Sequence, residues 1–74
     1  MTDLPDRLYR ETTLTRQQAA VVAGRVEGQT YQQIADELGV RRGTAHKHGE
    51  RALQKAQEAQ QTVRVLQEIG FIEE

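Results

Sequence analysis

The sequence predicts an all-α protein with three helices, the last of which extends far beyond the other two. Two segments with helical periodicity each begin with a Thr followed three residues later by a Gln, which is a capping-box pattern. A glycine and one apolar residue separate the second segment from a third, which shows no stop signal until Gly70. These observations predict a three-helix helix-turn-helix domain with a long C-terminal helix extended as a dimerisation coiled coil.

The first helix is predicted between Leu14 and Glu27. Thr15 occupies the N-cap position, and Gln18 completes the capping box, because its side chain can reach back to the backbone N–H of the cap residue. Val22 and Val26 are four residues apart, so we expect both to face the core.

The second helix is predicted over 30–38, with Thr30 as N-cap and Gln33 completing its capping box. Ile34 lies on the expected core face of this helix. Gly39 follows the helix and is expected to end it with a positive φ, a backbone conformation that glycine adopts without steric cost. Val40 is then the single apolar residue available to fill the turn.

The third helix begins near Arg42 and carries a heptad pattern with alternating intervals of four and three residues. We call these positions the seam: Ala45, Gly49, Ala52, Ala56, Ala59, Val63, Leu66 and Gly70. One helix over 42–69 would be roughly 40 Å long at 1.5 Å per residue, too long for a three-helix core to cover. The distal half is therefore expected to pack on a second copy; the alternative is a break near 60–61 with the segment folding back. The predicted dimer interface comprises Ala56, Ala59, Val63, Leu66, Ile69, Phe71 and Ile72.

Composition limits the chain to one small domain with a thin aliphatic core, since 36% of its 74 residues are hydrophobic and only 4% are aromatic. A core this small favours oligomerisation as a further source of stability. The absence of Cys rules out a disulfide framework and thiolate metal sites. No apolar run has the length of a membrane span and no signal-peptide pattern opens the sequence, so no membrane association and a cytoplasmic location are expected.

Charge is distributed unevenly, although the formal net charge is only −1. Five cations cluster around the start of the third helix, with Glu50 as the acidic residue among them: Arg41, Arg42, Lys47, Arg51 and Lys55. Acidic residues gather elsewhere: Asp3, Asp6, Asp36, Glu37, Glu68, Glu73 and Glu74. A local basic patch is what nucleic acid attracts, so the net charge of the whole chain does not exclude DNA as a partner.

These patterns divide the chain into three parts. Residues 1–13 mix charges of both signs around Pro5, and we expect a flexible N-terminal arm with no more than one ordered turn at Leu8–Tyr9. Residues 14–55 form the predicted helix-turn-helix domain, and residues 56–74 form the C-terminal helical extension assigned to dimerisation.

An ordered set of short motifs runs through the predicted domain: Leu14-Thr15, Gly28, Gln32-Gln33-Ile34-Ala35, Leu38-Gly39-Val40, Thr44-Ala45 and Ala52-Leu53. With these spacings the segment resembles the helix-turn-helix shared by sigma factor region four, LuxR/NarL-type regulators and archaeal Tfx-type DNA-binding proteins. The chain departs from that pattern at Gly24 and Gln29, where the family usually has Leu, and at Arg41, where it usually has Ser or Thr.

The resemblance implies that the solvent face of the second motif helix reads bases; that face carries Arg42, Gly43, His46, Lys47 and Glu50. Arg42 could contact a guanine edge with two hydrogen bonds. Side chains placed for phosphate contacts, which position the helix without reading sequence, are Gln32, Arg41, Thr44 and Arg51. His46 and His48 diverge by roughly 200° on a helix and cannot share a metal ion within one chain, so no metal site is predicted.

The function predicted from these features is sequence-specific DNA binding by a transcriptional regulator, a homodimer that places two recognition helices in successive major grooves of double-stranded DNA. The alternative is a small helical adaptor that binds transcription machinery or another basic partner without reading DNA. No catalytic residues, cofactor or small-molecule ligand are predicted, because the carboxylates are scattered and no glycine-rich phosphate loop or nucleophile–base order is present.

Overall fold

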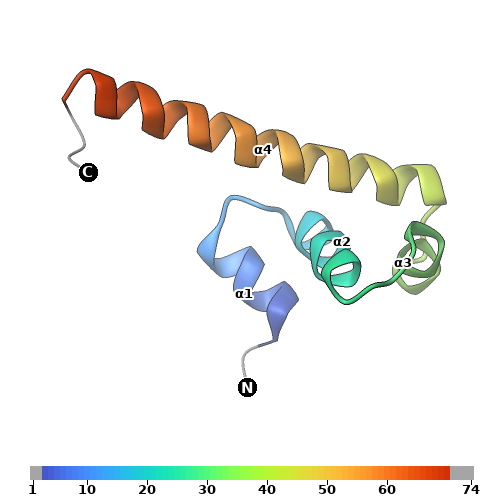
Figure 1. Ribbon diagram of the computed structural model, residues 1–74. Helices are drawn as coiled ribbons and strands as arrows, with labels where there is room; N and C mark the ends of the chain where they lie inside the picture. Colours follow the sequence, from blue (N-terminus) through green and yellow to red (C-terminus); the bar gives the residue numbers. More distant parts are fainter. Residues whose placement is uncertain (1–2, 71–74) are drawn as a thin grey trace.

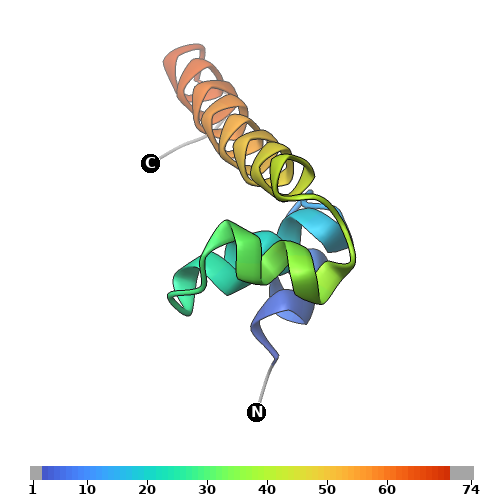
Figure 2. The same cartoon turned by 90° about the vertical axis from the view of Figure 1, so that its right-hand side faces the viewer.

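The structure, a computed structural model, describes residues 3–70, which form four helices and no strand (Figure 1). They are α1 (Leu4–Glu11), α2 (Arg16–Val26), α3 (Tyr31–Leu38) and α4 (Arg42–Glu68). Two views at right angles show α1, α2 and α3 on one side of α4, beneath its N-terminal part and middle (Figures 1 and 2). The predicted all-α class and the long last helix are confirmed, and one additional helix precedes them.

Helices α2 and α3 begin at the predicted capping boxes, and both boxes are complete. The Thr15 hydroxyl accepts from the Gln18 N–H at 3.1 Å, and the Gln18 side chain accepts from the Thr15 N–H at 3.1 Å. In α3 the corresponding distances between Thr30 and Gln33 are 3.1 Å and 2.8 Å. Each box satisfies two backbone donors that would otherwise lack a partner at the start of a helix, so the cap sequences define where these helices begin.

The turn of the motif lies between α3 and α4 and has the predicted geometry. Gly39 ends α3 with φ 70°, in the left-handed region where a side chain would be strained. The backbone N–H of Val40 donates to the Ala35 carbonyl at 3.0 Å, and the Val40 side chain is half-buried against the core. The turn therefore ends α3 and sets the direction in which α4 crosses it.

Helix α1 stands where the sequence analysis predicted a flexible arm, and that prediction was wrong. Pro5 lies in its first turn, where the missing N–H costs nothing. Two ion pairs join residues one turn apart along it, Arg7 with Glu11 and Arg10 with Asp6. Helix α1 packs on α2, and the Arg16 guanidinium lies 4.2 Å from the centre of the Tyr9 ring. The mixed charges that suggested a loose arm are i,i+4 partners on a helix surface.

The centre of the core is formed by Val21, Ile34, Ala35 and Ala45, with Ala19, Ala23 and Ala52 also buried. The prediction that Val22 and Val26 both face the core was wrong: Val26 is 71% exposed and Val22 is only half-buried. The reason is the phase of α2, whose residues 19–23 are all apolar, so that spacing alone does not decide which of them point inward. Val21 and Gly24 are buried instead, because α3 packs closely against this side of α2.

Gly24 is buried inside α2 because Ile34 and Gln29 lie directly against its backbone. A Cβ at this position would be 2.8 Å from Ile34 Cγ1 and 2.7 Å from Gln29 Oε1. Gly24 and Gln29, two of the departures from the family pattern, are therefore in contact with each other. The amide of Gln29 also donates to Glu37 Oε1 at 2.8 Å, which connects the start of the loop to α3.

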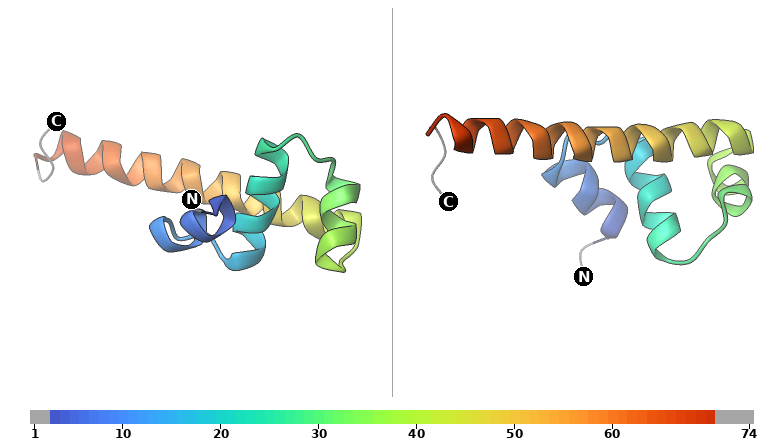
Figure 3. Two further views of the ribbon diagram at one scale, coloured as in Figure 1. Left: turned by 90° about the horizontal axis from the view of Figure 1, so that it is seen from below. Right: turned by 45° about the horizontal axis from the view of Figure 1, so that its top comes forward.

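Helix α4 is uninterrupted through residues 60–61, so the predicted alternative of a break and fold-back is not observed. Among the described residues, nothing covers the last turns of this helix, which project away from the other three (Figure 3). Val63 and Ile69 are 44% and 71% exposed, Leu66 is half-buried, and Gly70 has φ 81° just beyond the helix end. Phe71 and Ile72 of the predicted dimer interface lie outside the described residues. Across residues 3–70, no helix has both the length and the apolar character needed to cross a membrane.

Candidate nucleic-acid interface

The first turns of α4 present an exposed polar face to solvent, beside and opposite the face that packs on the core. Ala45 and Ala52 face inward and are 0% and 6% exposed. Lys47 follows Ala45 by two residues, which is a rotation of roughly 200° around the helix axis. We call the solvent side the reading face; it consists of Arg42, Gly43, His46, Lys47 and Glu50, all exposed. The structure thus brings the five predicted base-contacting residues onto one accessible surface.

The residues predicted to contact phosphates flank the reading face or lie on α3, and all four are exposed: Gln32, Arg41, Thr44 and Arg51. Arg41 is the N-cap residue of α4, and its side chain makes no capping hydrogen bond. The Gln32 amide donates to Asp36 Oδ1 at 2.9 Å and would have to exchange this partner for a phosphate. A phosphate contact of Gln32 would therefore cost an existing hydrogen bond of α3.

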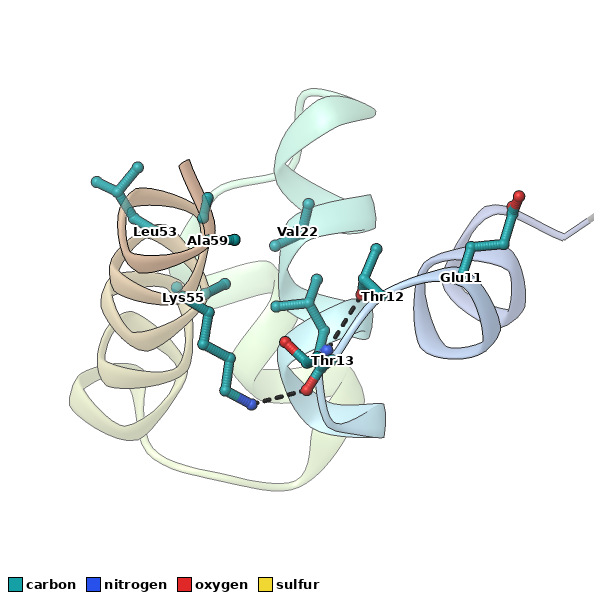
Figure 4. Close-up of a pocket in the computed structure, with 11 residues that line it drawn as sticks. Glu11, Thr12, Thr13, Val22, Leu53, Lys55 and Ala59 are labelled. Atoms are coloured by element: carbon teal, nitrogen blue, oxygen red, sulfur yellow. Dashed lines mark hydrogen bonds between the residues drawn. The ribbon is translucent and has the colours of Figure 1, made fainter. Parts of the chain in front are cut away.

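Lys55 does not belong to the basic patch, although it is close to it in the sequence. Its ammonium turns inward and donates to the Thr13 carbonyl at 2.9 Å (Figure 4). It also donates to Gln18 Oε1 at 2.8 Å. The same Gln18 oxygen closes the capping box of α2. Lys55 therefore joins α4 to the start of α2, and the patch retains four cations beside Glu50.

This arrangement predicts opposite effects for two lysines of the same helix. Lys55→Met should lower the free energy of unfolding by about 1–3 kcal/mol, because it removes hydrogen bonds from a charged donor. Lys47→Met removes an exposed lysine and should change stability by less than about 0.5 kcal/mol. Thermal unfolding of both variants measures the difference.

In duplex binding, Lys47→Met should have the larger effect and Lys55→Met the smaller one. Lys47→Met should weaken binding and lower the salt slope by about one, because it removes one positive charge from the surface that meets the DNA. Lys55→Met should leave the slope unchanged as long as the protein is folded. A salt slope that falls equally in both variants would contradict the inward position of Lys55.

Two residues of the reading face contact each other in the unbound protein. His46 Nδ1 lies 3.2 Å from Glu50 Oε1, one turn along α4. The His46 ring also meets the Tyr31 ring edge to face, with centroids 4.9 Å apart and an angle of 61° between the planes. His48 is half-buried on another side of the helix. No group of three metal-ligating side chains occurs in the described part of the chain.

A family model described as Sigma-70, region 4 matches residues 13–55. The chain belongs to the sigma-70 region 4 family. The matched segment covers α2, α3 and the first half of α4, which are the helix-turn-helix and the reading face. No curated protein and no solved structure gives a significant match. A sigma-70 region 4 domain is a DNA-binding, non-catalytic module. Helix α1 and the distal half of α4 lie outside the match.

The sigma-70 region 4 domain contains one cross-helix contact that the sequence did not reveal. The Arg25 guanidinium of α2 lies 4.7 Å from the centre of the Tyr31 ring of α3, on which His46 of α4 also packs. The three residues come from different helices, and neither periodicity nor a known motif connects Arg25 with Tyr31. Only the packing of the helices brings them together.

A groove of about 600 Å³ separates α4 of this sigma-70 region 4 domain from α2 and from the segment that joins α1 to α2 (Figure 4). On the α4 side it is lined by Gly49, Ala52, Leu53, Ala56 and Ala59, four of which are seam positions. Leu14 and Val22 line the other side together with residues 11–13. The sequence analysis did not reveal this groove. It extends the seam from the exposed end of α4 into the body of the domain.

Proposed function

We propose that this chain is a sequence-specific DNA-binding transcriptional regulator that reads duplex DNA with the N-terminal half of α4. The observation that carries the proposal is the reading face itself, an exposed polar surface of α4 with two cations on it, Arg42 and Lys47, and two beside it, Arg41 and Arg51. An α-helix fits the major groove of B-DNA, where each base pair presents a distinct set of donors and acceptors. The turn at Gly39 sets α4 at an angle to α3, as in helix-turn-helix domains that bind DNA.

In this mode of binding, phosphates position the helix and bases provide specificity. Arg41, Thr44 and Arg51 can contact the DNA backbone on the flanks of α4. Arg42 is exposed in the first turn, where a guanidinium can donate two hydrogen bonds to a guanine edge. Lys47 can donate to guanine N7 or O6, and Glu50 can accept from a cytosine amine once it separates from His46.

The test is a selection from random duplexes, followed by affinity measurements at several salt concentrations. Arg42→Ala should weaken binding to the selected duplex and relax the base preference at one position by about 1–3 kcal/mol. Arg64→Ala is the matched control, because Arg64 is an exposed arginine of the same helix far from the reading face. Unchanged affinity in both Arg42→Ala and Lys47→Ala would rule out α4 as the reader. A wild-type chain without duplex affinity even at low salt would instead favour the adaptor function.

We also propose that the chain forms a homodimer in which a second copy covers the seam. An uncharged face of α4 consists of Ala56, Ala59, Val63 and Leu66. Among the described residues, no other helix packs on Val63 and Leu66. Small residues at the groove end of the seam allow a second helix to approach closely, as in helix pairs packed through alanine and glycine. In such a dimer, Val63 and Leu66 of the second copy are the larger side chains that fill the groove of the first.

The position of the seam affects how such a dimer would meet DNA. Most of the reading face is turned away from the seam: Val63 and Lys47 differ by roughly 160° around the helix axis, although Arg42 lies only roughly 60° from Val63. A two-fold axis turns the two contact faces toward each other, so it turns the Lys47 sides of the two reading faces away from each other. The arrangement expected from the sequence, with both recognition helices in successive grooves of one straight duplex, does not follow from this interface. Each reading face would instead engage its own stretch of DNA.

A further inference from the structure

A chain of contacts crosses three helices and ends on the reading face. The Arg25 guanidinium of α2 stacks on the Tyr31 ring at 4.7 Å, and the His46 ring of α4 meets the same ring edge to face at 4.9 Å. His46 in turn lies 3.2 Å from the carboxylate of Glu50. A half-buried tyrosine therefore connects the core with two of the five residues of the reading face.

The contact with Tyr31 matters because His46 and Glu50 are surface side chains that are otherwise free to rotate. Their side chains are 53% and 61% exposed. An edge-to-face contact with a ring that is held in the core limits the orientations available to the imidazole. Fixing a side chain before binding lowers the entropy cost of the contact that it makes with its partner. Tyr31 thus acts on DNA recognition from outside the reading face.

Gly49 supports this account from the other side of the ring. It lies inside α4, where glycine disfavours a helix, and its backbone is next to the tyrosine. A Cβ at Gly49 would be 2.9 Å from the Tyr31 hydroxyl and 3.3 Å from its Cε1. The absence of a side chain at Gly49 is therefore what allows the ring to lie between Arg25 and His46.

We propose that Tyr31 is a positioning residue for base recognition: its ring, seated against Gly49, orients His46 and through it Glu50 on the reading face. The proposal rests on the function proposed above, because it assumes that this face reads bases. It assigns a role in specificity to a residue on α3 that need not contact DNA.

The test measures the base preference of Gly49→Ala, of Tyr31→Phe and of the double variant by selection from random duplexes. Gly49→Ala should displace the ring and reduce the preference at the position read by His46 and Glu50 by roughly tenfold, the loss of one specific contact. Tyr31→Phe keeps the ring and should retain the preference. The double variant should recover it, because removing the hydroxyl removes the 2.9 Å clash and leaves only the milder contact with Cε1.

Salt dependence and helicity separate positioning from loss of structure. A displaced ring should change the base preference and leave the salt slope of binding unchanged, since the phosphate contacts remain. Tyr31→Leu provides a second route if Gly49→Ala fails to fold. It keeps an apolar side chain at the core edge, removes the aromatic edge, and should lose the same base preference.

The outcomes distinguish this proposal from the one on which it rests. A wild-type protein without base preference would overturn the assignment of the reading face and this inference with it. A wild-type protein with a clear preference that Tyr31→Leu and Gly49→Ala both retain would overturn the positioning role alone. Loss of the preference in Gly49→Ala with recovery in the double variant would support it.

Discussion

Gly24→Ala is expected to destabilise the fold by about 1–3 kcal/mol, the usual cost of adding a methyl group to a well-packed interior. The added Cβ would lie 2.8–2.9 Å from two side-chain atoms of Ile34, which is 2% exposed and cannot move outward. Gln29 blocks the same space at 2.7 Å, and its amide is held by Glu37. In a domain of this size such a loss is a large part of the total stability. Thermal or denaturant unfolding measures it.

The matched control is Gly43→Ala, the same substitution at an exposed position in the first turn of α4. A Cβ at Gly43 meets no atom within 4 Å, and alanine is the better helix former, so stability should stay equal or rise slightly. Equal effects of the two substitutions would contradict the close approach of α2 and α3. Because Gly43 is on the reading face, this control is used for unfolding and not for DNA binding.

Leu66→Asp is expected to convert a dimeric protein into a folded monomer. A carboxylate in an apolar interface without a partner charge is costly, and Leu66 is the largest residue of the seam. The helix-turn-helix core lies elsewhere on the chain, so the variant should keep its helicity. Sedimentation should show half the mass of the wild-type protein at the same concentration. Affinity for a short duplex with one site should be unchanged, because the reading face is at the other end of α4.

Val65→Asp is the control for this experiment. Val65 is the neighbouring residue, 42% exposed, roughly 100° around the helix from Leu66 and outside the seam, so the same carboxylate there should leave the dimer intact. A wild-type protein that sediments as a monomer at high concentration would exclude the homodimer.

The same pair of variants tests the outward orientation of the reading faces. A wild-type dimer should hold two separate duplexes together, which can be followed by capture of a labelled duplex on an immobilised one. Leu66→Asp should abolish this capture and Val65→Asp should not. If the wild-type protein instead binds two sites on one short duplex much more tightly than one site, and Leu66→Asp removes that gain, both reading faces must lie on the same side of the dimer.

Several features of the fold followed from the sequence because their causes are local. A Thr and a Gln three residues apart satisfy the first backbone donors of a helix wherever they occur, which is why the starts of α2 and α3 were predicted correctly. Gly39 ended α3 because a positive φ is available to glycine at no steric cost. The continuity of α4 followed from the absence of any stop signal between Arg42 and Gly70.

Other features depended on residues that are distant in the sequence. The segment of α1 was taken for a loose arm, although it packs on α2, which lies further along the chain. Lys55 was counted in the basic patch, but the carbonyl and amide oxygens that hold it belong to residues about forty positions earlier. Its direction cannot be inferred from its neighbours on α4.

The sequence by itself determined helices α2, α3 and α4, the turn of the motif and the family, because caps, glycines and helical spacing act within a few residues. Only the tertiary structure decided which side of α2 is buried, since five consecutive apolar residues leave the phase open and the approach of Ile34 to Gly24 settles it. The structure also decided the contacts of Arg25, Tyr31 and His46 across three helices.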